Sequence, residues 1–93
     1  MNRKSNKTWQ PDKSIAFRTI DNETIIIGIS GGEVHLLNET ASFLWNLLAG
    51  APQSADDLIL ALCDTYAVSK SEAQNDVNEF LAGLAAKKLI VEL

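Results

Sequence analysis

Residues 32–50 read GEVHLLNETASFLWNLLAG and join a short apolar strand to an apolar helix almost without a loop. Val34 to Leu37 form the predicted strand. Asn38 is typical of a helix N-cap, because its side chain can accept hydrogen bonds from main-chain N–H groups in the first helical turn. Apolar side chains then recur up to Gly50, which with Pro52 marks the end of the helix. This junction organises the rest of the predicted fold.

Two further strands are predicted before the junction. Residues 15–20 alternate in a way that suits a strand with one buried face. Residues 24–29 are rich in isoleucine, whose β-branching favours strands, and their two apolar faces indicate a central position in a sheet. Turn-forming residues at 21–23 and 30–32 leave only short connections, so the three strands should form an antiparallel meander.

Two more helices are predicted after Pro52, and both begin with a capping box. Ser54 pairs with Asp57 in the first of them, and Ser69 pairs with Glu72 in the second. The last helix places apolar residues on one stripe at helical spacing, namely Ala73, Val77, Phe80, Leu81 and Leu84. The predicted fold is therefore α+β and winged helix-turn-helix-like, with a three-stranded antiparallel sheet followed by three helices around one core.

The length of 93 residues allows one small domain, expected over residues 15–93. Residues 1–14 are polar and are expected to form a flexible arm, in which only Trp9 and Pro11 are suited to packing. Cys63 is the single cysteine, and no segment has the length of a membrane span or the pattern of a signal peptide. We therefore expect a cytoplasmic protein with no membrane partner.

The charge distribution argues against nucleic acid as a partner. Residues 15–93 contain eleven acidic side chains and only four basic ones. A nucleic-acid-binding domain needs clustered cations that neutralise phosphates. A DNA-binding winged helix nevertheless stays as an alternative function, because the expected geometry allows it.

The sequence lacks the residue patterns of an active site. His35 and Cys63 are single residues of their type, far apart in sequence, so neither has the motif spacing of a catalytic pair or a metal site. Gly31 and Gly32 fit a hairpin turn and lack the lysine of a phosphate-binding loop. We expect no catalytic residues, no metal and no cofactor, and hence a protein that is not an enzyme.

The third strand offers a binding surface made of main chain. In a three-stranded meander, residues 33–37 form an edge whose N–H and C=O groups are open to an extended peptide. Small residues of the last helix, Ala82, Gly83 and Ala86, would leave a groove beside that edge. The alternatives are that the edge is merely short, that the N-terminal arm covers it, or that it pairs with a second copy in a structural homodimer.

Many positions of the chain also resemble the PqqD family, the peptide chaperones of pyrroloquinoline quinone biosynthesis and related recognition elements of ribosomally made, modified peptides. The resemblance covers most of the chain from about residue 15 onward. It departs from the family pattern at Val34-His35 and at Lys87-Lys88. The residues that carry it are Leu37-Asn38-Glu39-Thr40-Ala41, Leu44-Trp45, Gly50, Asp57-Leu58, Leu62, Tyr66-Ala67-Val68, Ala73, Asp76-Val77, Phe80-Leu81, Leu84 and Leu89-Ile90.

This resemblance implies a non-catalytic peptide chaperone. The leader segment of a precursor peptide is expected to add as a strand to the third strand, to lie against the last helix and to be presented to a modifying enzyme, often a radical S-adenosylmethionine protein. The peptide-binding residues that it implies are Val34, His35, Leu36, Asp76, Phe80, Gly83 and Lys87. The first three supply mainly main-chain hydrogen bonds, and the other four border the groove.

Overall fold

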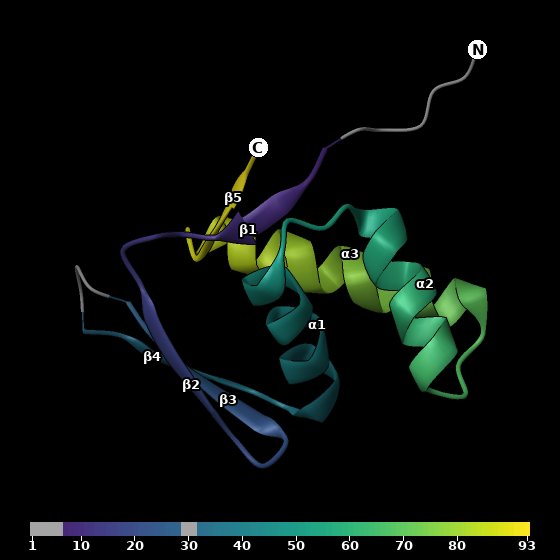
Figure 1. The fold of residues 1–93 in the computed structure, drawn as a ribbon, viewed down its shortest axis with the longest axis horizontal. Helices are drawn as coiled ribbons and strands as arrows, with labels where there is room; N and C mark the ends of the chain where they lie inside the picture. Colours follow the sequence, from purple (N-terminus) through teal and green to yellow (C-terminus); the bar gives the residue numbers. More distant parts are fainter. Residues whose placement is uncertain (1–6, 29–31) are drawn as a thin grey trace.

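The structure, a computed structural model, describes residues 7–28 and 32–93. It has the predicted α+β order of a three-stranded meander followed by three helices, with one additional strand near each end of the described chain (Figure 1). The elements in chain order are β1 (Trp9–Pro11), β2 (Ala16–Ile20), β3 (Glu23–Ile27), β4 (Val34–Leu37), α1 (Glu39–Gly50), α2 (Ala55–Thr65), α3 (Lys70–Ala86) and β5 (Ile90–Glu92).

The main sheet is antiparallel and has the order β2-β3-β4, so β3 is central and β4 lies at an edge. Ile26 of β3 stands opposite Phe17 on one side and His35 on the other, and this row faces α1. The adjacent row, with Ile25 opposite Arg18 and Leu36, faces the other way, because successive strand residues point to opposite faces. The expected central strand and the expected edge strand are both confirmed.

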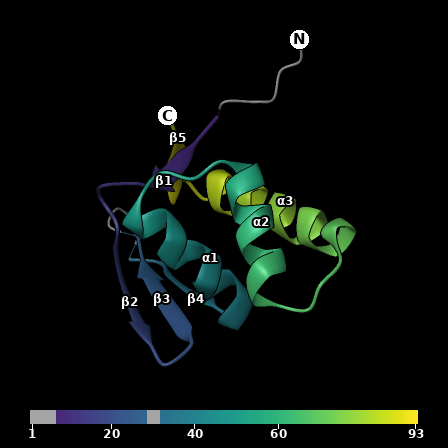
Figure 2. The same cartoon turned by 45° about the vertical axis from the view of Figure 1, so that its right-hand side comes forward.

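The core lies where α1 packs between the sheet and the two other helices (Figure 2). Trp45 of α1 is completely buried, and its ring meets Phe17 of β2 edge-to-face with centroids 5.3 Å apart. This contact joins α1 to the sheet. The buried hydrophobic side chains are Ile26, Leu44, Trp45, Leu48, Leu58, Ile59, Leu62, Ala73, Val77, Leu81, Leu84, Leu89 and Ile90.

The outer face of the sheet is apolar but exposed. Ile20, Ile27, Val34 and Leu36 all lie on this face, and each remains largely accessible to solvent. Helix α1 covers only the opposite face (Figures 1 and 2). The two apolar faces of β3 thus have different surroundings, one in the core and one open within the described part of the chain.

Residues 9–11, which fall inside the arm expected over residues 1–14, form β1. This strand pairs with β5, and the Trp9 N–H donates to the Gln53 carbonyl over 2.8 Å. The sequence pattern did not reveal β1, because its partners lie far along the chain and only the folded helices bring them together. In the described residues β1 therefore joins β5 and leaves the edge of β4 open. Residues 1–6 of the expected arm lie outside the described residues.

Each helix begins at the predicted cap. The Ala41 N–H donates to Asn38 Oδ1 over 2.9 Å at the start of α1. Both expected capping boxes are present, from Ser54 to Asp57 and from Ser69 to Glu72, with reciprocal side-chain and main-chain hydrogen bonds. These caps fix where α1 leaves the sheet and where α2 and α3 begin.

Candidate functional site

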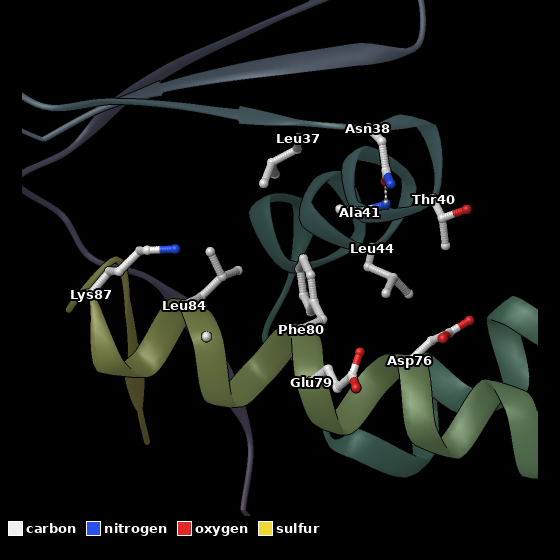
Figure 3. A pocket seen from close by; sticks show the side chains of 11 residues that line it. Leu37, Asn38, Thr40, Ala41, Leu44, Asp76, Glu79, Phe80, Leu84 and Lys87 are labelled. Atoms are coloured by element: carbon white, nitrogen blue, oxygen red, sulfur yellow. Dashed lines mark hydrogen bonds between the residues drawn. The ribbon is translucent and has the colours of Figure 1, made fainter.

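A groove of about 420 Å³ separates β4 and α1 from α3 (Figure 3). This volume lies within the range of ligand pockets in proteins. In Figure 3 the side chains of Leu37, Phe80 and Leu84 project into the space between the two walls. The groove is lined by Leu37, Asn38, Thr40, Ala41 and Leu44 on one wall and by Asp76, Glu79, Phe80, Gly83, Leu84 and Lys87 on the other.

One face of α3, together with its C-cap residue Lys87, forms one of the two walls of this groove. Asp76, Phe80, Gly83 and Lys87 are three or four residues apart, which places them on one side of a helix. Phe80 is half-buried: it packs against the core and also lines the groove. Phe80 thus lies on the apolar stripe expected for the last helix and also borders the groove, because it stands at the boundary of the core.

Gly83 has no side chain to project into the groove that it lines. A Cβ atom at this position would meet no atom within 4 Å outside its own helix backbone, so the space above the glycine is open. A glycine inside a helix costs stability, because the unfolded chain loses more conformational freedom on folding. Gly83 lies in the last turn of the 17-residue helix α3, where it leaves the groove open at a cost in helix stability.

Replacing Gly83 with alanine is expected to raise the free energy of unfolding by about 0.5–1 kcal/mol. The added methyl group has room, and alanine is the better helix former. Urea denaturation monitored by circular dichroism measures the change. A lower stability of Gly83→Ala would mean that the space at this position is not open.

The outer edge of β4 carries unpaired main-chain groups. The Gly28 N–H donates to the Glu33 carbonyl over 2.9 Å, which makes Gly28 and Glu33 a hydrogen-bonded pair. Such pairs alternate along an antiparallel ladder, so His35 and Leu37 also bond to β3. The N–H and C=O groups of Val34 and Leu36 therefore point away from β3, toward the side where no other strand pairs with β4 in the described chain.

Charge is distributed unevenly along the groove. Asp76 and Glu79 lie at one end of the α3 wall, and Lys87 lies at the other, with Phe80 and Leu84 between them (Figure 3). Asp76, Glu79 and Lys87 are exposed, and within the described residues none of them forms an ion pair or a side-chain hydrogen bond. The groove thus has an apolar middle, an acidic end and a basic end.

The comparison with protein families identifies the chain. The family described as "Coenzyme PQQ synthesis protein D (PqqD)" matches residues 23–90, which include β3, β4 and all three helices. The chain belongs to the PqqD family. The resemblance noted in the sequence is thereby confirmed. The search of curated proteins finds no match.

Two solved structures share the PqqD-like fold of this chain. One is described as TbiB1 in complex with the TbiA(beta) leader peptide; it is 25% identical, with a TM-score of 0.81, and the match covers 87% of this chain and 93% of that one. The other is described as lasso peptide synthetase B1 complexed with the leader peptide. It is 20% identical, with a TM-score of 0.78 over 89% of this chain and 96% of that one, and shows the fold alone.

The seven residues predicted for peptide binding fall into two groups in this PqqD-family structure. Asp76, Phe80, Gly83 and Lys87 lie together on the α3 wall of the groove, whereas Val34, His35 and Leu36 lie on β4 outside the hollow itself. His35 Nε2 is 3.3 Å from Glu33 Oε1, so the imidazole contacts the residue that precedes β4. Whether these seven residues contact a peptide stays a prediction.

Sequence reasoning missed the opposite wall of the groove. Leu37, Ala41 and Leu44 lie at the strand-to-helix junction and were interpreted only as parts of the fold. Glu79 was missed as well, although its position three residues after Asp76 places it close to the predicted face. The helical spacing along α3 could have identified Glu79. The junction residues could not be recognised as groove residues, because they line a groove only when α3 packs opposite them.

The single histidine and the single cysteine of the chain lie on different elements. Cys63 of α2 is a half-buried thiol packed against the core, and His35 lies on β4. Among residues 7–28 and 32–93, no cluster of three or more His, Cys, Asp or Glu side chains has the arrangement of a metal site. In the same residues, no helix has both the length and the apolar character that crossing a bilayer requires.

Proposed function

We propose that this PqqD-family chain is a peptide chaperone that binds the leader segment of a ribosomal precursor peptide by strand addition to β4. The observation that carries the proposal is the open edge of β4, with the N–H groups of Val34 and Leu36 directed outward beside a groove. An extended peptide satisfies such groups and places alternate side chains in neighbouring pockets. The apolar middle of the groove, formed around Leu37 and Phe80, suits such side chains.

The solved structure of TbiB1 supports the proposal that this chain binds a leader peptide. TbiB1, which shares the fold over most of both chains, is described in complex with a leader peptide.

In the proposed function, the peptide bound to this chain is then presented to a modifying enzyme. We expect that enzyme to be a radical S-adenosylmethionine protein or another enzyme of quinone-cofactor or related peptide biosynthesis. The chain itself contributes binding and no catalysis. Incubation with the peptide should therefore leave the peptide mass unchanged, as mass spectrometry will record.

Peptide binding can be measured without knowing the natural precursor. Fluorescein-labelled synthetic peptides that cover the first parts of the short reading frames beside the gene, and short peptides selected from a randomised display library, serve as probes. Fluorescence anisotropy should show saturable binding at micromolar protein, about −8 kcal/mol. If no peptide from either source binds saturably, a leader-binding role is excluded.

A bulky side chain in the groove should block binding without unfolding the chain. Gly83→Phe fills the groove from α3, and we expect the affinity for a selected peptide to fall by about tenfold or more. Ala82→Phe is the matched control, because Ala82 is the adjacent residue on α3 and is exposed outside this groove. Equal affinities of the two variants would contradict the proposed position of the peptide.

The open edge also suits a second copy of the chain, as in a structural homodimer. Sedimentation across a range of protein concentrations distinguishes the two occupants. A leader-binding chain should bind its peptide as a monomer or release a dimer when the peptide is added, because both ligands require the same main-chain groups. A dimer that persists at saturating peptide would place the peptide elsewhere.

A further inference from the structure

The charges along the groove have no internal partners. Asp76 and Glu79 at one end and Lys87 at the other are exposed, and the described residues provide no opposite charge for any of the three. All three lie on the α3 wall that faces the strand-to-helix junction (Figure 3). A ligand that occupies the groove therefore lies beside acidic side chains at one end, apolar side chains in the middle and a basic side chain at the other end.

We propose that the groove selects its peptide by a pair of opposite charges. A basic side chain of the peptide pairs with Asp76 and Glu79, and an acidic side chain pairs with Lys87. Apolar residues lie between the two and contact Phe80 and Leu84. This inference rests on the proposed function, because it concerns a peptide strand beside β4.

The spacing of the two charges in the peptide follows from helix and strand geometry. Lys87 lies eight residues after Glu79 and eleven after Asp76, which is about 12–16 Å along a helix axis. An extended chain covers this distance in about four or five residues. Residues that point to the same side of a strand are separated by an even number, so a separation of about four is favoured.

The contribution of these charges is selectivity rather than most of the affinity. Ion pairs at an exposed rim stabilise a complex only modestly, whereas like charges placed opposite each other weaken it. The apolar contacts and the main-chain hydrogen bonds are common to many peptides. The charge pair distinguishes one peptide from another and fixes the register of the peptide along β4.

The test compares peptide selections on two proteins. A library of short linear peptides with randomised sequence is selected on the natural chain and on a variant that carries Asp76→Lys, Glu79→Lys and Lys87→Glu. Peptides selected on the natural chain should contain a basic and an acidic residue about four positions apart. Peptides selected on the variant should contain the same two charges in reversed order.

Affinity measurements then quantify the effect. A peptide selected on the natural chain should bind the charge-reversed variant about tenfold more weakly. The control variant Glu23→Lys, Asp64→Lys, Lys70→Glu changes the same kinds of charge at exposed positions outside the groove, and it should bind within about twofold of the natural chain.

The outcomes separate this inference from the proposed function. Each selected peptide is also tested on Leu36→Pro, which removes an outward main-chain donor of β4. Binding that depends on Leu36 but is equal for the natural and charge-reversed chains would overturn the charge pair and leave strand addition intact. If no selected peptide depends on Leu36, strand addition is overturned, and the charge pair with it.

Discussion

Leu36→Pro is expected to weaken leader-peptide binding by about tenfold or more while the fold stays intact. Proline has no N–H, and the Leu36 N–H is one of the two β4 donors that point away from β3. The ring also obstructs an approaching strand, as prolines do at natural sheet edges. Because this N–H takes no part in the β3–β4 ladder, the sheet should tolerate the change. Fluorescence anisotropy with a selected peptide measures the loss.

Two other variants make this result interpretable. Leu36→Ala retains the N–H and removes only a side chain that is 75% exposed on the outer face, so peptide affinity should stay within about twofold. His35→Pro removes a donor that bonds to β3 and should destabilise the sheet itself. If Leu36→Pro binds the peptide as tightly as Leu36→Ala does, the peptide does not pair with β4.

Trp45→Ala is expected to lower the free energy of unfolding by about 3–5 kcal/mol. Trp45 is completely buried and contacts Phe17 across the interface between α1 and the sheet, so its loss leaves a cavity at the centre of the core. A small domain has a total stability of only about 5–15 kcal/mol. The variant should therefore unfold at much lower urea concentration, and the groove should lose its shape because α1 forms one of its walls.

Leu60→Ala is the matched comparison for the core. Leu60 lies on α2 with 64% of its surface exposed, and its truncation should change stability by less than about 0.5 kcal/mol. Urea denaturation followed by far-ultraviolet circular dichroism compares the two variants. Similar midpoints for Trp45→Ala and Leu60→Ala would show that α1 does not pack against the sheet through Trp45.

The helices and the main sheet could be predicted from the sequence because their signals are local. Asn38, Ser54 and Ser69 are caps whose partners lie three residues further on, and each forms the predicted bond. The alternation and isoleucine content of residues 15–29 likewise identified β2 and β3, and the short turns identified their order. Such features depend on residues that are close together in the sequence, so they can be recognised without knowledge of the tertiary contacts.

Other features could not be predicted because they depend on contacts between distant segments. Strand β1 exists only because β5 and Gln53 lie beside it in the folded chain. The junction wall of the groove, with Leu37 and Ala41, becomes a wall only when α3 packs opposite it. The exposed outer face of β3 also escaped prediction, since an apolar pattern does not say which face the helices cover.

Amide hydrogen exchange at β4 is the most direct test of strand addition. A peptide selected by its Leu36-dependent affinity is added to the uniformly labelled chain, and exchange is followed residue by residue. We expect the amides of Val34 and Leu36 to exchange slowly only when the peptide is bound, because the peptide strand supplies their acceptors. Unchanged exchange at both amides, in a chain saturated with peptide, would contradict strand addition to β4.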